Sequence, residues 1–173
     1  RTLPGTDHPL AAYLTRGSGH DIDAIYTEDP ENWANNMERL HRKFESAREF
    51  VPEPVVDMVP GAELGLVAFG STDMAIKEAR DILREAGIKS SYLRLRALPS
   101  NMKLHNFIAQ HDRVYVIEMN MDGQLHKLIQ LEIPEMAHRV RSAAFSDGLP
   151  LTAEIVTTII QSMECDEHGD DSD

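Results

Sequence analysis

Cysteine is almost absent from this chain of 173 residues, and so are several other features that would assign a function directly. The single cysteine, Cys165, lies in a polar stretch near the end of the sequence. One cysteine can form no disulfide within the chain and no cysteine-ligated metal or cluster site made by this chain alone. We therefore expect a protein of the reducing cytoplasm.

The sequence also lacks long apolar runs and an excess of basic residues. No segment approaches the roughly 18 uninterrupted apolar residues of a membrane helix, and the first residues do not resemble a secretory signal. Lys and Arg total 17 against 29 Asp and Glu, a formal net charge of -12. Because nucleic-acid affinity depends on basic side chains that contact phosphates, we exclude DNA and RNA as partners. We expect a soluble protein with no membrane partner.

Three regions of the chain differ in composition. Residues 1–53 begin with a loop-like segment and contain one amphipathic helix, so we expect a linker arm that follows something larger. Residues 54–163 alternate short β-rich runs with helical ones and form the expected α/β domain, for which an apolar content of 42% is sufficient. Residues 164–173 are acidic with almost nothing apolar to bury, and we expect a disordered tail.

The amphipathic helix of the arm is predicted between residues 29 and 50. Asp29 can cap this helix, and Pro30 suits its first turn. Its apolar positions recur in alternating steps of four and three, which places one stripe on the helix: Trp33, Met37, Leu40, Phe44 and Ala47. The stripe must pack on something, either the following domain or a part of the protein outside this sequence.

Strands and helices alternate from residue 64 onward. The predicted strands lie at residues 64–69, 91–96, 113–119 and 140–145, and the predicted helices at residues 72–86, 101–110, 124–132 and 151–163. The second strand alternates apolar and basic side chains, so we place it near an edge of the sheet. Strands joined by helices need crossover connections. The fold class is therefore α/β and doubly wound, with helices on both faces of a mostly parallel sheet.

Polar residues gather where the third predicted strand ends. In open α/β sheets, ligands and partners usually meet the carboxyl ends of the strands. Glu118, Asn120 and Gln124 lie at this end. Asn120 and its neighbours are equally suited to a turn and a helix cap. A carboxylate that ends a buried strand needs a partner, for which we expect Arg94 or Arg96 of the neighbouring strand.

The segment Phe69-Gly70-Ser71-Thr72 joins the first predicted strand to a helix. Its backbone N–H groups can hold an anion, while its residue types suit a tight turn and a helix cap equally well. The segment lacks the G-x-G-x-x-G and Walker spacings of nucleotide-binding loops, and Ser71 lacks the G-x-S-x-G context of a nucleophile. Ser71 is therefore a candidate interface residue rather than a catalytic one.

A second candidate region is the glycine-containing loop with Arg16, His20 and Asp21. A base and carboxylates on a flexible loop are the ingredients of a catalytic or metal-binding loop, but the histidines of the chain lack metal-ligand spacing. We therefore assign no catalytic, cofactor-binding or metal-ligating residue. The candidate interface or substrate-channel residues are Arg16, His20, Asp21, Ser71, Arg96, Glu118, Asn120 and Gln124.

Seven short motifs occur in the order in which one known family carries them. They are Leu3-Pro4-Gly5, Tyr13-Leu14-Thr15-Arg16-Gly17-Ser18-Gly19-His20-Asp21, Asn36-Met37-Glu38-Arg39-Leu40, Ala68-Phe69-Gly70-Ser71, Leu95-Arg96-Ala97-Leu98-Pro99, Glu118-Met119-Asn120 with Gly123-Gln124-Leu125, and Asp147-Gly148-Leu149-Pro150-Leu151. Their succession resembles the alpha subunit of 2-oxoacid:ferredoxin oxidoreductases, most like the 2-oxoglutarate type. The resemblance implies that the chain is its C-terminal, transketolase-C-like domain with the preceding linker.

The resemblance implies a thiamine diphosphate enzyme of the cytoplasm that converts 2-oxoglutarate, CoA and oxidised ferredoxin to succinyl-CoA, CO2 and reduced ferredoxin. Thiamine diphosphate, magnesium and an iron-sulfur cluster would be held elsewhere in the complete enzyme, and this fragment would bind none of them and be inactive alone. The implied partners are the upstream domains of the same subunit and a beta subunit, with ferredoxin a partner of the whole complex. The loop after Gly19 departs from many relatives, which carry a glutamate just after a His-Asn or His-Asp pair.

A protein of another class is the alternative. A stand-alone flavodoxin-like module would bind a small ligand at the same edge of the sheet, where the strands end. A flavin bound there would colour the purified protein yellow, so an absorbance spectrum distinguishes this module from a domain that serves in subunit and domain assembly.

Overall fold

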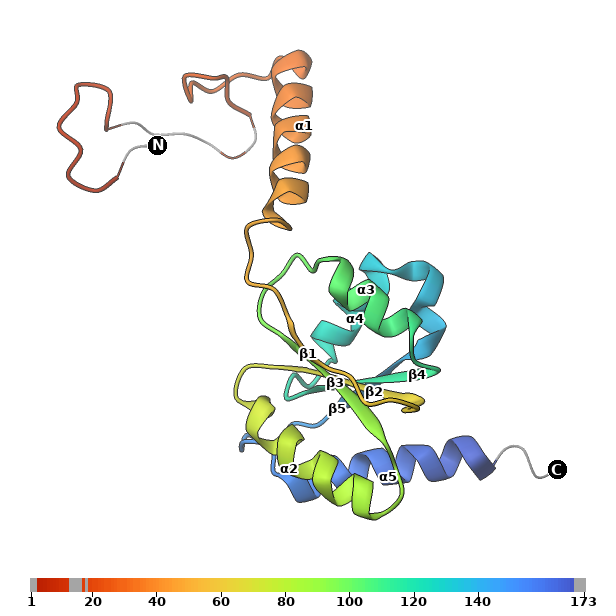
Figure 1. Cartoon of the computed structure of the whole chain (residues 1–173). Coiled ribbons are helices and arrows are strands. Elements are labelled where there is room, and N and C mark those ends of the chain that lie inside the picture. The colour runs from red at the N-terminus through yellow and green to blue at the C-terminus, as the bar shows by residue number, and fades with distance from the viewer. Residues whose placement is uncertain (1–2, 13–16, 18, 170–173) are drawn as a thin grey trace. The chain divides into compact units, whose positions relative to one another are not determined.

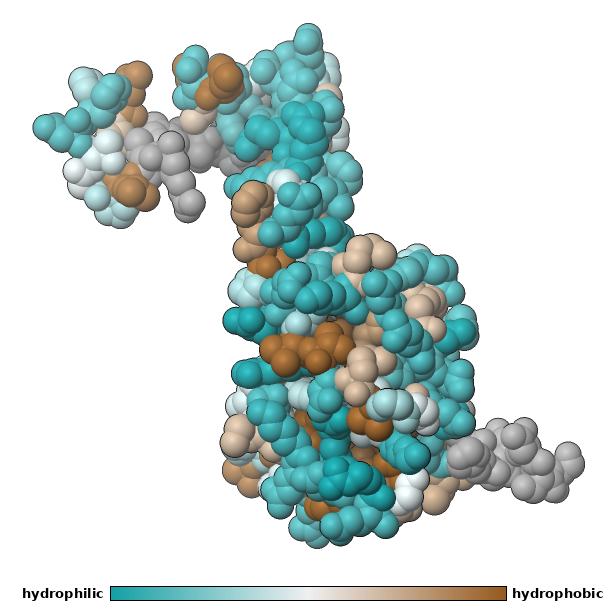
Figure 2. All heavy atoms as spheres, in the orientation of Figure 1, coloured by the Kyte–Doolittle hydropathy of each residue, from teal (hydrophilic) through white to brown (hydrophobic). Residues whose placement is uncertain are grey.

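We describe a computed structural model of the chain, in which residues 3–12, 17 and 19–169 are placed (Figure 1). The chain forms two compact units, residues 1–50 and residues 51–173. The second unit begins at Val51, close to Pro54, where the sequence analysis began the α/β domain. Figure 2 shows a mostly hydrophilic surface with separate apolar patches on one face of this second unit.

The first unit contains one long helix. α1 (Pro30–Ala47) begins at the predicted cap, where Asp29 accepts hydrogen bonds from the backbone N–H groups of Glu31 at 3.4 Å and Asn32 at 3.3 Å. These bonds satisfy two N–H groups that have no partner within the helix. None of the residues of α1 is buried among the described residues, and Trp33, Leu40 and Phe44 of its apolar stripe are exposed.

Five strands form one sheet in the second unit. They are β1 (Val55–Asp57), β2 (Leu64–Phe69), β3 (Ser90–Leu95), β4 (Arg113–Glu118) and β5 (Val140–Ala144), in the order β1-β3-β2-β4-β5. β2, β3, β4 and β5 run parallel, whereas β1 is antiparallel to β3. The mostly parallel sheet confirms the predicted fold class. The second predicted strand, β3, lies near an edge as expected, although the unpredicted β1 pairs with it and is the edge strand itself.

Helices cover both faces of the sheet (Figure 1). One face carries α2 (Thr72–Glu85) and α5 (Ala153–Gly169). The other carries α3 (Met102–Ala109), α4 (Gln124–Glu132) and the 3-10 helix η1 (Pro134–Arg139). This arrangement confirms the doubly wound architecture. In the placed part of the chain, we find no helix with the length and apolar character that a bilayer crossing requires.

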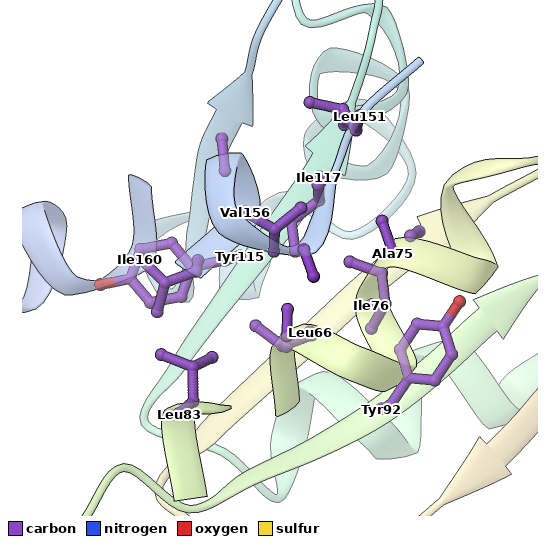
Figure 3. Packing of buried hydrophobic residues seen from close by; sticks show 14 of the residues in the cluster. Leu66, Ala75, Ile76, Leu83, Tyr92, Tyr115, Ile117, Leu151, Val156 and Ile160 are labelled. Atoms are coloured by element: carbon purple, nitrogen blue, oxygen red, sulfur yellow. The ribbon is translucent and has the colours of Figure 1, made fainter. Parts of the chain in front are cut away.

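The strands contribute to two apolar clusters, one on each face. On one face, Leu66 and Tyr115 pack against residues of α2 and α5 such as Ile76 and Ile160 (Figure 3). The cluster on the other face joins the sheet to α3 and α4 and contains Val67, Leu93, Leu104, Phe107, Val116, Leu125 and Ile129. Burying one such side chain stabilises a fold by about 1.5–3 kcal/mol. The two clusters therefore hold the strand ends in fixed positions.

α5 continues into the region predicted to be a disordered tail. Glu164 is only 8% exposed. Its carboxylate accepts two hydrogen bonds from Arg113, both at 3.0 Å, and one from the Tyr115 hydroxyl at 2.6 Å. The prediction of disorder is wrong for Glu164, because its carboxylate is buried with partners from the sheet. Residues 170–173 of the predicted tail lie outside the described residues.

Replacing Glu164 by alanine should destabilise the α/β unit by about 2–4 kcal/mol, because Arg113 and the Tyr115 hydroxyl would lose a buried acceptor. Asp166, an exposed residue of the same helix, gives the matched control. Asp166→Ala should change the free energy of unfolding by less than about 0.5 kcal/mol. Urea unfolding followed by circular dichroism measures both changes. Equal stability of the two variants would contradict the anchoring role of Glu164.

Candidate functional site

The carboxyl ends of β2, β3 and β4 surround a cleft of about 510 Å³. β3 and β4 lie on opposite sides of β2, so the strand order reverses at this point. Open α/β sheets usually bind their ligands at such a reversal. We call this feature the strand-end cleft, and it is lined by residues 69–70, 94–98, 120, 124, 125 and 128.

Five of the predicted site residues lie at this edge of the sheet. Arg96, Asn120 and Gln124 line the strand-end cleft. Ser71 is exposed at the start of α2, where its side chain makes no capping hydrogen bond. Glu118 ends β4 and is fully buried. The structure thus gathers these residues where the sequence analysis expected them, and their part in function stays a prediction.

The buried carboxylate of Glu118 caps α4. It accepts hydrogen bonds from the side-chain amide of Asn120 at 2.8 Å and from the backbone N–H groups of Leu125 at 2.9 Å and His126 at 3.0 Å. The two backbone groups belong to the first turn of α4 and have no acceptor within the helix. A negative charge at this end of a helix is also stabilised by the helix dipole. Glu118 is therefore a structural residue of the β4–α4 connection.

Gly123 makes this cap possible. Its backbone has a φ of 61°, in the left-handed region that side chains disfavour. A Cβ atom at this position would lie 2.9 Å from the Oγ of Ser142 and 3.9 Å from the Oε1 of Glu118. The backbone N–H of Gly123 donates to the carbonyl of Asn120 at 3.0 Å. Residues 120–123 therefore form the turn that the sequence analysis considered for them.

A second polar network lies at the start of α2. Asp73 is 5% exposed and contacts Lys77 at 2.9 Å, the Tyr92 hydroxyl at 3.1 Å and Arg94 at 3.5 Å. Burial raises the pKa of Asp73, but the hydrogen bonds from Lys77 and Tyr92 and the charge of Arg94 outweigh burial, so the pKa lies below its ordinary value of 3.8. Burial and the neighbouring carboxylate raise the pKa of Tyr92, which therefore remains a hydrogen-bond donor.

Arg96 is held less firmly than Arg94. Its exposed guanidinium donates one long hydrogen bond, 3.5 Å, to the backbone carbonyl of Glu53. Among the described residues no acidic side chain pairs with Arg96, and none lines the cleft. The expected pairing of Glu118 with Arg94 or Arg96 is wrong, because helix amides satisfy the carboxylate instead. The strand-end cleft is thus locally cationic in a chain with a formal net charge of -12.

His20 and Asp21 belong to the first unit, where they form part of a short hairpin. The Nδ1 atom of His20 lies 2.7 Å from the carbonyl oxygen of Gly17, and Asn36 of α1 donates to the carbonyl of His20 at 2.6 Å. The Oδ1 atom of Asp21 accepts two backbone N–H groups of the same loop at 3.0 and 2.9 Å. These bonds pair polar groups of His20 and Asp21 with groups of the first unit itself. Arg16 lies outside the described residues.

The described residues do not fit the cofactors expected of the complete enzyme. An iron-sulfur cluster takes several cysteine thiolates, and the sequence contains Cys165 alone. Within residues 3–12, 17 and 19–169, no group of three or more His, Cys, Asp or Glu side chains could hold a metal ion. We therefore derive no chemical step of those cofactors from this chain.

Sequence reasoning missed Asp73, which positions Arg94. Tyr92, Arg94 and Arg96 occupy alternate positions, so their side chains share one face at the end of β3. That pattern is the signal that could have pointed to an acidic partner on the neighbouring helix. Because Glu118 was expected to pair with Arg94, Asp73 was not considered as its partner.

Comparison with known proteins decides the family. Residues 62–154 match the model of the pyruvate:ferredoxin oxidoreductase core domain II. This chain belongs to that family.

The alpha subunits of 2-oxoacid:ferredoxin oxidoreductases 1 and 2 of Aeropyrum pernix are relatives. The first is 35% identical over 144 aligned residues, 73% of this chain and 22% of the relative. The second is 30% identical over 126, 69% of this chain and 20% of the relative. The chain therefore spans about a fifth of the length of these curated relatives.

Solved structures share the fold. The 2-oxoglutarate:ferredoxin oxidoreductase from Magnetococcus marinus, with 2-oxoglutarate, coenzyme A and succinyl-CoA bound, superposes with a TM-score of 0.71 at 25% identity, over 92% of this chain and 27% of that chain. A split-gene transketolase, an inactive beta4 tetramer, superposes with a TM-score of 0.52 at 20% identity, over 64% of this chain and 40% of that chain. The resemblance to 2-oxoacid:ferredoxin oxidoreductase alpha subunits and the transketolase C-terminal-like fold are confirmed.

Replacing Glu118 by alanine should destabilise the α/β unit by about 2–4 kcal/mol, because two N–H groups of α4 would lose their acceptor and a cavity would remain. Glu118→Gln keeps an acceptor oxygen and should lose less. Asp122→Ala changes an exposed residue of the same turn and should alter stability by less than about 0.5 kcal/mol. Urea unfolding compares the three variants. A larger loss for Asp122→Ala than for Glu118→Ala would contradict the cap.

Asp73 should stabilise the fold in a pH-dependent way. Its folded-state pKa lies below 3.8, so its stabilisation is fully present above the unfolded-state pKa and is lost as the pH falls through the folded-state pKa. Asp73→Asn should therefore be less stable than the wild type at neutral pH, and the difference should shrink below about pH 4. Thermal unfolding across this range measures the difference, with Asp81→Asn, in an exposed pair of the same helix, as control. A difference independent of pH would be inconsistent with the lowered pKa.

Proposed function

We propose that the chain is the C-terminal domain of the alpha subunit of a thiamine diphosphate-dependent 2-oxoacid:ferredoxin oxidoreductase. The complete enzyme would convert 2-oxoglutarate, CoA and oxidised ferredoxin to succinyl-CoA, CO2 and reduced ferredoxin. The observation that carries the proposal is the family match over residues 62–154, together with two relatives that are alpha subunits of such enzymes. The choice of 2-oxoglutarate rests on the similarity to the Magnetococcus marinus enzyme. The family match favours this domain over the stand-alone flavodoxin-like module.

In this proposal the domain serves in subunit and domain assembly and carries none of the catalytic groups. The described lining of the strand-end cleft consists of arginine, amide and apolar side chains with one glycine and one alanine, and includes no thiol, histidine or carboxylate. Such a set can orient a partner or a ligand but offers no general base or metal ligand. Thiamine diphosphate, magnesium and the iron-sulfur cluster belong to the rest of the complex.

The stripe of α1 supplies a surface for assembly. Trp33, Leu40 and Phe44 are 54%, 45% and 55% exposed. Because about half of each side chain is still exposed, its burial would stabilise a complex by roughly 1 kcal/mol, and aligned apolar side chains of this size are typical of an interface. The opposite face is polar and carries an ion pair between Glu38 and Arg42 at 2.6 Å. We assign the stripe to a contact with the upstream alpha-subunit domains or the beta subunit.

Assembly with the upstream part of an alpha subunit and a beta subunit should depend on this stripe. Leu40→Glu and Phe44→Glu should each lower the yield of the complex by about tenfold or more, because a charge would be buried in the contact. Arg42→Glu, on the polar face, is the matched control and should assemble normally. Size-exclusion chromatography with light scattering measures the complex, and ferredoxin reduction measures its activity.

The isolated chain should bind no thiamine diphosphate and turn over no 2-oxoacid, whereas the assembled complex should reduce ferredoxin. Calorimetry with thiamine diphosphate and magnesium tests the isolated chain for binding. Turnover by the chain alone would refute the assembly role. Normal assembly of both stripe variants would refute the assignment of α1 to the interface.

A further inference from the structure

Positive charge collects at the mouth of the strand-end cleft. Arg94 and Arg96 both line it, and no acidic residue does so in the described part of the chain. Arg94 is anchored by Asp73 at 3.5 Å, whereas Arg96 makes only a long hydrogen bond to a backbone carbonyl. Arg96 therefore retains most of its donors for a ligand. In a chain of net charge -12, such a position favours an anion.

The rest of the cleft is apolar. Leu95 and Leu125 form buried parts of its wall, and Phe69, Leu98 and Leu128 are 39%, 44% and 47% exposed. The cleft volume of about 510 Å³ lies within the range of about 300–1,000 Å³ that is usual for organic ligands. A small inorganic anion would leave these apolar side chains in water. An anion with an aliphatic body would cover them, which stabilises binding in proportion to the area removed from water.

The backbone amides at the start of α4 are already used. Glu118 takes the N–H groups of Leu125 and His126 at the start of α4, and also the side-chain amide of Asn120. These amides of α4 are not open to an anionic head, whereas the exposed guanidinium of Arg96 is, with the exposed amide of Gln124 beside the same cleft. A planar guanidinium binds a carboxylate with two parallel hydrogen bonds. The donor set suits a carboxylate.

The shape of the cleft favours a compact ligand over an extended polypeptide. Its lining comes from the ends of β2, β3 and β4 and from the first turns of α4, which together form one local site. A docked strand or helix would need a longer surface with repeated contacts. The lining instead combines apolar side chains with two arginines at a single site.

We propose that the strand-end cleft binds a medium-chain aliphatic carboxylate, with the carboxylate at Arg96 and the chain along Leu98 and Leu128. This inference goes beyond the assembly role and does not depend on it. The residues that line the cleft all lie within residues 51–173, so its binding can be tested on this chain.

Octanoate is the probe. It is titrated into the full chain, in which the methyl groups of the leucine residues carry carbon-13 labels. Two-dimensional NMR should show saturable shifts at Leu98 and Leu128. Octanol has the same chain without the charge, and octylammonium has the opposite charge. Both should bind at least about fivefold more weakly than octanoate, because they cannot form the charge-assisted hydrogen bonds with a guanidinium.

Substitutions separate the two parts of the site. Arg96→Gln should weaken octanoate binding about fivefold to tenfold and leave octanol binding unchanged. Arg84→Gln, an exposed arginine of α2 outside the cleft, is the control. Leu128→Glu should weaken octanoate binding by more than about tenfold, because it places a like charge in the apolar wall. Leu131→Glu, on the same helix, 79% exposed and outside the cleft, should bind normally.

Equal binding of octanoate and octylammonium would overturn the proposal, and so would unchanged octanoate binding by Arg96→Gln. No saturable shift at Leu98 and Leu128, combined with loss of subunit assembly in Leu128→Glu, would assign the cleft to a polypeptide and would also overturn it. The assembly assay with the α1 variants is independent of octanoate, so failure of this proposal is distinguishable from failure of the proposed function.

Discussion

Glu118 joins the sheet to the helix layer at the edge where the strand-end cleft lies. Its carboxylate is fully buried and takes two backbone N–H groups of α4 and the amide of Asn120. Because a buried carboxylate without such partners is costly, this pairing fixes the path from β4 into α4. It also fixes the positions of Asn120 and Gln124 at the cleft. A residue that the sequence offers as a candidate for the interface or substrate channel is therefore a determinant of the fold.

The charge of the cleft follows from the same pairing. The helix dipole and the amides of α4 compensate Glu118, so the carboxylate does not attract the arginines of β3. Arg94 instead meets Asp73 on α2, and Arg96 extends to the rim of the cleft with a single weak bond. If Glu118 held Arg96, both arginines of the cleft would have a carboxylate partner. Separate partners for the acidic and basic groups leave a cationic rim on an apolar depression.

The sequence predicted the parallel strands and their helices because burial on both faces gives long apolar runs between helical periods. β1 escaped prediction, because three residues are too few for a period and Val55 and Val56 are 54% and 37% exposed. Without β1, the basic residues of β3 looked like an edge strand. The acidic composition of the last residues also led to a wrong prediction of disorder at Glu164. Its partner Arg113 lies 51 positions away in the sequence and is brought close only by the fold. Local sequence patterns predicted the strands and helices. Pairs of charged residues that are far apart in the sequence determine which charged groups remain at the strand-end cleft.

The motifs that carry the family resemblance have two kinds of physical basis at this edge. Gly70 and Gly123 have φ values of 63° and 61°, and Glu118 caps α4, so the fold itself requires these residue types. Arg96 and Leu98 belong to another of these motifs, yet Arg96 makes one 3.5 Å bond and Leu98 is 44% exposed. Leu98 is therefore only partly packed, and Arg96 is only loosely held. A bound molecule with an anionic head and an aliphatic body, as proposed for the strand-end cleft, would add contacts at both positions.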